Sequence, residues 1–128
     1  MMHKVLRIAI ALVGLLNLGL GLAFLYAPVR MAAEFSITAI GSQGLATIRA
    51  DFPGFFITAG LFALLGLETN KRGALWVPVT LLGIAFVGRT LSLLLDGVGP
   101  DALPPMIAEA MMIAILIAGI RAKPQSAP

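Results

Sequence analysis

Cysteine is absent from this chain, and charged side chains are scarce. Without cysteine there is no disulfide framework, no thiolate nucleophile and no cysteine metal site. Only 12% of the 128 residues are charged, whereas 59% are hydrophobic. Such a composition leaves too little polar surface to coat a small soluble globule. The chain is therefore predicted to lie in a membrane, with lipid as its main partner.

Histidine and the common enzyme motifs are also missing from the apolar part of the chain. The single histidine, His3, precedes the first apolar run, and there is no Gly-rich phosphate loop, His-Glu-x-x-His pair or serine elbow. A metal site built from imidazole or thiolate is excluded, and no cofactor is expected. The formal net charge is +3, but no basic helix face carries interleaved aromatic residues, so no nucleic-acid partner is expected.

Long apolar runs are what the sequence does contain. Four of them approach the roughly 20 residues that a membrane-spanning helix needs, and the first is too long for the core of a cleaved secretory signal. We predict a single all-α domain over residues 1–128, an integral membrane four-helix bundle. The spans are expected at residues 5–27, 51–67, 74–95 and 103–120, followed by a disordered tail at 121–128.

Lysine and arginine are distributed unevenly over the ends of these spans. Because cytoplasmic flanks carry the excess of basic residues, both termini are expected in the cytoplasm. The residues on the cytoplasmic side would be Lys4, Arg7, Lys71, Arg72, Arg121 and Lys123, against Arg30 and Arg49 outside.

The connection between the first two spans, residues 28–50, is the longest. A short interfacial helix is expected near residues 31–35 and an extended piece at 36–40. We interpret the segment as an outer cap over the mouth of the bundle, with a plain surface loop as the alternative. Pro53 is expected in the first turn of the second span, and Pro78 is expected to kink the third.

Small residues four positions apart recur in the spans. In lipid they let helix backbones approach, so they indicate helix contacts within the bundle, with a homodimer face as the alternative. The sets are Gly19 and Ala23, Ala59 and Ala63, Gly88 and Ser92, and Ala110, Ala114 and Ala118.

Five charged side chains lie inside or at the edges of the apolar spans. A charge at mid-bilayer costs about 2.5 to 3.5 kcal/mol on insertion scales, so these groups need partners or a function. Helical spacing allows four faces, one on each span, to point inward together, with Ser92 beside Arg89 and Asn17 on the first span. The faces are Gly14, Asn17, Gly21 and Phe24; Asp51, Phe55, Thr58 and Phe62; Ala85, Arg89, Ser92 and Asp96; and Pro105, Glu109, Met112 and Leu116. We predict a polar pocket that opens outward and is closed inward by apolar side chains. The five are Arg49, Asp51, Arg89, Asp96 and Glu109.

Arg89 is the expected anchor of this pocket, because a guanidinium stays charged and binds carboxylate or phosphate through two hydrogen bonds. Glu109 is its expected partner, since at about 1.5 Å per residue the two lie at one depth, with Asp51 nearer the outer mouth. Three carboxylates face two arginines, so Glu109 or Asp96 is expected to hold and release a proton. Alternatively, the ion pairs only fix the helix register.

Other candidates also have plainer interpretations. Arg49 and Asp51 stand at a predicted span boundary, where an interfacial anchor and a helix N-cap are common. Asn17 lies among glycines and is equally suited to a hydrogen bond between helices.

Two segments carry a resemblance to a known family. They are the Arg49–Phe56 stretch, Arg-Ala-Asp-Phe-Pro-Gly-Phe-Phe, and the Gly88–Gly97 stretch, Gly-Arg-Thr-Leu-Ser-Leu-Leu-Leu-Asp-Gly. With Glu109 early in the fourth span, they resemble small bacterial four-span membrane proteins of unknown function, loosely grouped with DoxX-like proteins. Pro53 replaces the glycine that the pattern leads us to expect. The resemblance implies the four-span architecture, a bacterial inner-membrane location and the same choice of polar residues, but no reaction.

Three functions follow as hypotheses. The first is a pocket that binds or helps to move a small anionic or amphipathic, lipid-like molecule through Arg89. The second is a membrane-embedded isomerase or hydrolase in which Asp96 and Glu109 act as acid and base. The third is a structural subunit of a membrane complex whose charges pair with one another or with a partner.

Overall fold

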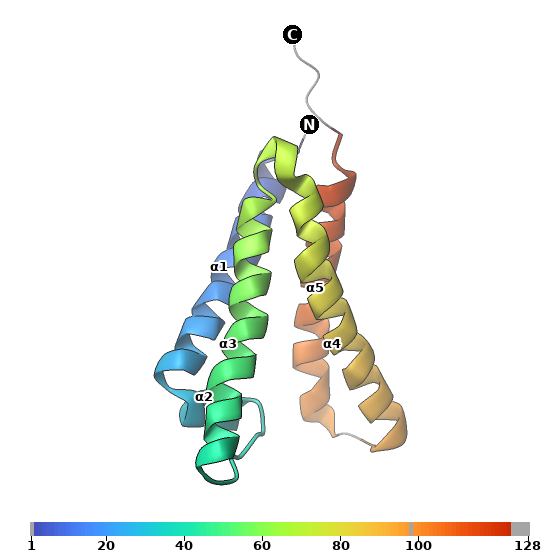
Figure 1. Ribbon diagram of the computed structural model, residues 1–128. Coiled ribbons are helices and arrows are strands. Elements are labelled where there is room, and N and C mark those ends of the chain that lie inside the picture. Colours follow the sequence, from blue (N-terminus) through green and yellow to red (C-terminus); the bar gives the residue numbers. More distant parts are fainter. Residues whose placement is uncertain (1, 98, 124–128) are drawn as a thin grey trace.

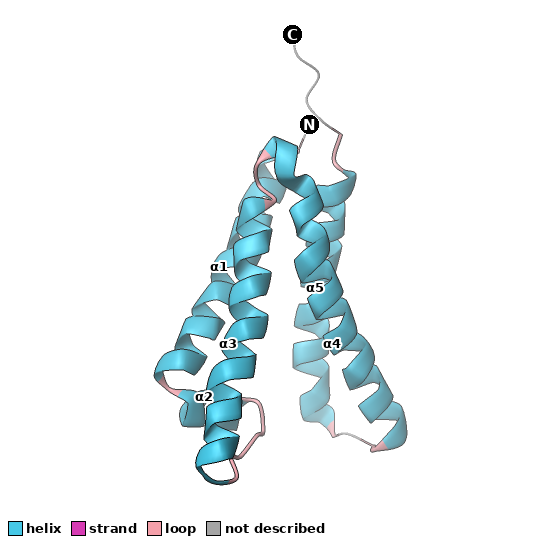
Figure 2. Ribbon diagram, viewed as in Figure 1, coloured by secondary structure: helices cyan, strands magenta, loops and turns pink. Residues whose placement is uncertain are grey.

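The computed structural model describes residues 2–97 and 99–123, and every regular element in these residues is a helix (Figures 1 and 2). The predicted all-α class is confirmed. Of the predicted tail, Arg121 is the last residue of a helix, and residues 124–128 lie outside the described residues. The elements are α1 (Lys4–Tyr26), α2 (Pro28–Glu34), α3 (Gly41–Leu65), η1 (Thr69–Leu75), α4 (Trp76–Leu95), η2 (Pro100–Ala102) and α5 (Leu103–Arg121).

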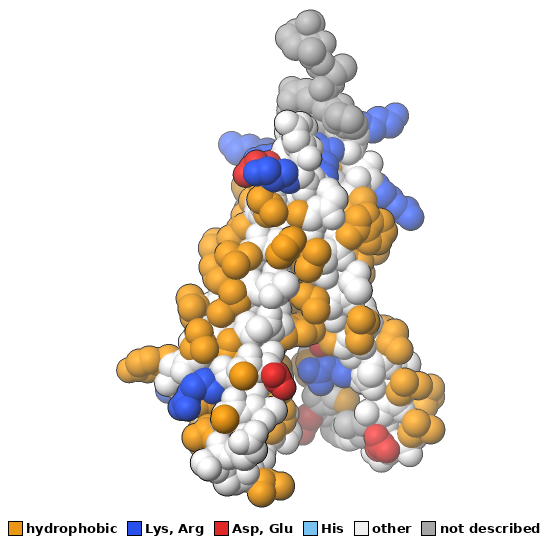
Figure 3. Space-filling model, viewed as in Figure 1, with side chains coloured by type: hydrophobic (Ala, Val, Ile, Leu, Met, Phe, Trp, Pro, Cys, Tyr) orange, Lys and Arg blue, Asp and Glu red, His pale blue; other side chains and the backbone are white. Residues whose placement is uncertain are grey.

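Four helical segments are long and apolar enough to cross a membrane: Lys4–Tyr26, Gly41–Leu65, Thr69–Leu95 and Leu103–Arg121. Their outward faces are apolar over most of the height of the bundle (Figure 3). Exposed leucine, isoleucine and valine on every side would be a liability in water, but they match acyl chains. The chain therefore has the architecture of a multi-pass membrane protein.

The four long helices form two neighbouring pairs, α1 with α3 and α4 with α5 (Figure 1). The pairs converge at the end that holds the start of α1, η1 and the end of α5, which we call the closed end. They diverge toward the opposite end, which we call the open end and which holds α2, the start of α3 and η2. The bundle is thus shaped like an inverted V.

The closed end is held by an apolar core and by two arginines. Leu75 of η1 is fully buried there in a cluster that includes residues of α1, α3, α4 and α5. Arg7 Nη1 donates a hydrogen bond to the Leu67 carbonyl oxygen at 2.9 Å, and Arg72 Nη1 donates one to the carbonyl oxygen of Ala122. These bonds tie α1 to the connection after α3, and η1 to the end of α5.

The α1–α3 pair is packed through glycines. A Cβ added at Gly60 would lie 2.7 Å from Gly14 O and from Leu18 N, and one added at Gly21 would lie 3.0 Å from Ile57 N. The two backbones are therefore in direct contact, as small residues permit in membranes.

The predicted small-residue contacts are only partly right. Ala59 and Ala63 are fully buried, but the other sets do not make tight contacts. Gly19 and Gly88 have open space where a Cβ would lie. All three alanines of the last set are exposed: Ala110, Ala114 and Ala118.

Helix α3 begins earlier than the sequence suggested. It starts at Gly41, whose φ of +64° suits glycine, and runs without a break through Pro53. Asp51 is therefore in the helix interior and is not an N-cap, and Pro53 is not in the first turn. Pro78, in turn, occupies the third position of α4, where its missing N–H leaves no helical bond unmade.

The segment between α1 and α3 contains the expected short helix, α2, and then turns through Ser36, whose φ is 59°. It packs against α1 and α3 through an aromatic cluster. The ring of Phe24 stacks on Phe52 at a centroid distance of 4.7 Å and contacts Phe35 at 5.4 Å and Phe56 at 5.8 Å. The segment thus lies against the α1–α3 pair at the open end, and in Figure 1 it does not reach across the mouth to α4 and α5.

Candidate functional site

A cavity of about 480 Å³ lies between the two helix pairs. In the space-filling view the molecule is hollowed between its two halves toward the open end, and basic and acidic side chains lie together in that hollow (Figure 3). Three lining residues are charged, Asp51, Arg89 and Glu109. The remainder are apolar: Leu16, Leu20, Phe35, Phe52, Phe55, Phe56, Leu82, Ala85, Pro105, Ala108 and Met112.

Three of the predicted inward faces contribute some of their residues to the lining of this cavity. Each is a set of residues three or four positions apart, as one helix face requires. They are Asp51 with Phe55 on α3, Ala85 with Arg89 on α4, and Pro105 with Glu109 and Met112 on α5.

The inward face predicted for α1 is a different case. Gly14, Asn17, Gly21 and Phe24 are all buried, and the two glycines lie against α3. Helix α1 instead lines the cavity with Leu16 and Leu20. Its polar residue therefore lies behind the wall of the cavity.

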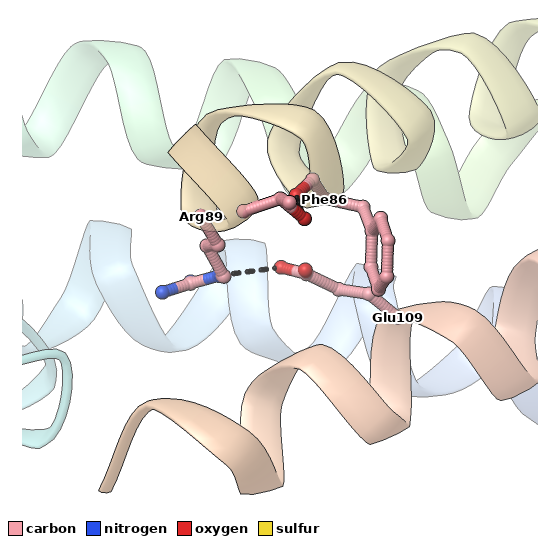
Figure 4. A network of polar contacts seen from close by, with 4 residues as sticks. Phe86, Arg89 and Glu109 are labelled. Carbon is pink, nitrogen blue, oxygen red and sulfur yellow. Dashed lines mark hydrogen bonds and ion pairs between the residues drawn. The ribbon is translucent and has the colours of Figure 1, made fainter. Parts of the chain in front are cut away.

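Arg89 and Glu109 form the expected ion pair across α4 and α5 (Figure 4). Arg89 Nε donates a hydrogen bond to Glu109 Oε1 at 2.9 Å. The Arg89 side chain is 37% exposed and that of Glu109 only 10%. Within the described part of the chain, the terminal nitrogens of Arg89 make no hydrogen bond, and the buried Glu109 Oε2 has no partner.

The ion pair thus orients the guanidinium of Arg89 but uses only one of its three nitrogens. One nitrogen is held by Glu109, while the two terminal nitrogens remain available to a carboxylate or phosphate. Such a group would be bound in surroundings that are otherwise apolar, where charged hydrogen bonds are strengthened.

Asp51 lies on the facing helix α3 and also lines the cavity. In the described chain it takes part in no ion pair and accepts no hydrogen bond from a side chain. At about 1.5 Å per residue, Asp51, Arg89 and Glu109 all lie about 18 to 21 Å along their helices from the closed end. Asp51 is therefore at the depth of the pair, and not nearer the mouth as expected.

Asn17 is 1% exposed. Its Nδ2 donates to Val13 O at 2.9 Å and approaches Met112 Sδ at 3.5 Å, while the buried Oδ1 has no partner. Met112 of α5 lines the cavity, whereas Asn17 does not. The Asn17 amide therefore contacts a residue of another helix, as in the predicted alternative of a hydrogen bond between helices.

Besides Asn17, three more predicted site residues are not brought to the cavity. Arg49 is exposed on α3, Ser92 is half-buried on α4, and Asp96 is exposed directly after the last residue of α4. Over the described residues, no third His, Asp or Glu joins Asp51 and Glu109 in a group that holds a metal ion.

Of the aromatic wall, only Phe55 was predicted from the sequence, on the same helical face as Asp51. Phe52 and Phe56 lie four residues apart on α3, with Phe52 three residues before Phe55, and this spacing was a usable signal. Phe35 had none, because it enters the wall from the connection between α1 and α3.

No known protein family, curated protein or solved structure matches this chain. The resemblance to small four-span bacterial proteins therefore stays a prediction.

Proposed function

We propose that this protein binds, or helps to move, a small anionic or amphipathic molecule with an anionic group in the cavity between its two helix pairs. The observation that carries the proposal is the guanidinium of Arg89, held by Glu109 at 2.9 Å beside a cavity of about 480 Å³ with a largely apolar lining. An anionic head would bind the terminal nitrogens of Arg89. The apolar part would lie against leucine and phenylalanine side chains.

Charge and depth support this proposal. A charged group that deep in a membrane is costly unless it serves a partner or a ligand, and Glu109 satisfies only one nitrogen of Arg89. The closed end is filled by apolar side chains, so entry is expected from the open end or sideways from lipid. With the termini in the cytoplasm, as the basic flanks predict, and with a bacterial inner membrane, as the resemblance implies, the open end would face outward.

The proposal is tested by thermal unfolding of the protein in an uncharged detergent with added alkyl phosphates and alkyl carboxylates. A ligand that binds only the folded state raises the unfolding temperature with its concentration. We expect a rise for the wild type and for Arg30→Gln, a control that removes an exposed arginine of α2. Uncharged alcohols with the same chains should have a weaker effect.

The decisive variant is Arg89→Gln combined with Glu109→Gln, because it removes the binding cation without leaving a buried carboxylate unpaired. This double variant should lose the rise given by the anionic amphiphiles. An equal rise in the double variant, or no rise in the wild type, would contradict the proposal.

A structural role is the second candidate, favoured by the Arg89–Glu109 pair itself. It predicts strong energetic coupling between the two residues and no ligand effect on stability.

The hypothesis of an acid–base enzyme has less support. Glu109 is buried and lines the cavity, whereas Asp96 is exposed after the end of α4 and does not line it.

A further inference from the structure

Asp51 has no counter-charge within the described chain, although it lines the same cavity as Arg89. Its helix, α3, belongs to one helix pair, whereas α4 and α5 belong to the other. Asp51 is exposed, and a carboxylate without a counter-charge at this depth is costly where lipid and not water surrounds it. The cavity therefore presents a free acceptor on one side and free donor nitrogens on the other.

These two groups do not neutralise each other, because no ion pair joins Asp51 to Arg89. A molecule that lies between them is placed to contact both. Its end near α4 would need to accept hydrogen bonds from a guanidinium, and its end near α3 would need to donate hydrogen bonds to a carboxylate.

The net charge of the three ionisable groups in the cavity limits which kind of molecule can bind there. Arg89 carries one positive charge, and Asp51 and Glu109 carry one negative charge each. A purely anionic occupant would add to this negative excess in low dielectric, where like charges repel strongly. A purely cationic occupant would leave the terminal nitrogens of Arg89 without an acceptor. A zwitterion serves both groups and adds no net charge.

The surroundings of Asp51 suit an ammonium group. Phe55 is four residues further along α3, on the same face, and Phe52 is adjacent; both line the cavity. Aromatic faces attract cations, and more so where water is excluded. The carboxylate and the neighbouring rings together form one end of the site.

We infer that the occupant is a zwitterionic amphiphile whose ammonium binds Asp51 and whose phosphate or carboxylate binds Arg89. This inference rests on the proposed function and specifies the ligand class of the same cavity. The alkyl part lies along the apolar wall, and the head spans the gap between α3 and α4.

The test uses three amphiphiles with the same alkyl chain: an alkyl phosphoethanolamine, an alkyl phosphate and an alkylamine. Their dissociation constants are measured by titration calorimetry on the purified full chain in an uncharged detergent. For the wild type we expect the zwitterion to bind about tenfold more tightly than either singly charged compound, the usual scale for one additional charged hydrogen bond.

Variants at Asp51 and at the Arg89–Glu109 pair test the two ends of the site separately. Asp51→Asn should bring the zwitterion to the affinity of the alkyl phosphate, whereas Asp51→Glu should keep most of the preference. Asp101→Asn, which alters an exposed acid outside the cavity, should change nothing. Arg89→Gln with Glu109→Gln should bring the zwitterion to the affinity of the alkylamine.

The outcomes distinguish this inference from the proposed function. If alkyl phosphate binds as tightly as the zwitterion, or if Asp51→Asn keeps the preference, the zwitterion is wrong while anion binding at Arg89 stands. If the alkylamine binds as tightly as the zwitterion, Arg89 contributes nothing and the inference is also wrong. If none of the three compounds binds the wild type, the proposed function fails together with it.

Discussion

The Arg89–Glu109 pair is asymmetric, and its asymmetry predicts which partner is harder to remove. The Glu109 side chain is 10% exposed and has one oxygen without a partner, whereas the Arg89 side chain is 37% exposed. Arg89→Gln leaves the buried Glu109 carboxylate without its counter-charge. Breaking a buried pair in this way lowers the free energy of unfolding by about 3 to 5 kcal/mol. Glu109→Gln leaves the partly exposed guanidinium of Arg89 without its carboxylate. We expect this change to lower the free energy of unfolding by about 1 to 3 kcal/mol.

The double variant removes both charges of the pair. With both residues changed to glutamine, no charge is stranded, and the two amides are able to hydrogen-bond to each other. The double variant should therefore lose less stability than Arg89→Gln alone, with a coupling of about 2 kcal/mol between the two sites. Stability is measured as the free energy of unfolding in mixed micelles with increasing denaturing detergent, followed by helical circular dichroism.

The exposed pair of Lys71 with Glu68 is a matched control. Its nitrogen–oxygen distance is 2.7 Å, but the two side chains are 51% and 59% exposed. The same glutamine cycle there should show a coupling below about 1 kcal/mol. The reasoning is refuted if Arg89→Gln costs no more than Glu109→Gln, or if the costs of the two changes simply add.

Three further predictions follow from the packing and the orientation. Gly60→Ala should cost about 1 to 3 kcal/mol in the same unfolding assay, because the new Cβ would lie 2.7 Å from backbone atoms of α1. Gly54→Ala, where a Cβ meets open space, should be neutral or stabilising, and equal losses would contradict the close approach of α1 and α3. Asn17→Leu should leave the free energy of unfolding unchanged or higher, since it removes a buried oxygen without a donor; a loss above about 2 kcal/mol would show that the Nδ2 contacts dominate. Because the chain has no cysteine, Ser42→Cys and Asn70→Cys are clean probes of topology. A membrane-impermeant thiol reagent should label Ser42→Cys in intact cells and Asn70→Cys only after permeabilisation, and the reverse pattern would invert the predicted orientation.

The sequence alone determined the class of the fold and its spans. Apolar runs of sufficient length are a local property, and helices are the way in which such runs satisfy their backbone hydrogen bonds in lipid. The same local reasoning identified the lining faces that contain Arg89 and Glu109, because residues three and four apart share a face.

Only the tertiary structure decided where α3 begins and which side of α1 faces the cavity. Residues 41–50 are not a continuous apolar run, so hydropathy placed the span at Asp51, but the helix extends back to Gly41 and places Asp51 at the level of Arg89. In α1, both the lipid and the protein interior accept leucine, so no pattern of polar and apolar residues separates the two sides. Backbone contact at Gly14, Gly21 and Gly60 turns Asn17 away from the cavity and leaves Leu16 and Leu20 to line it.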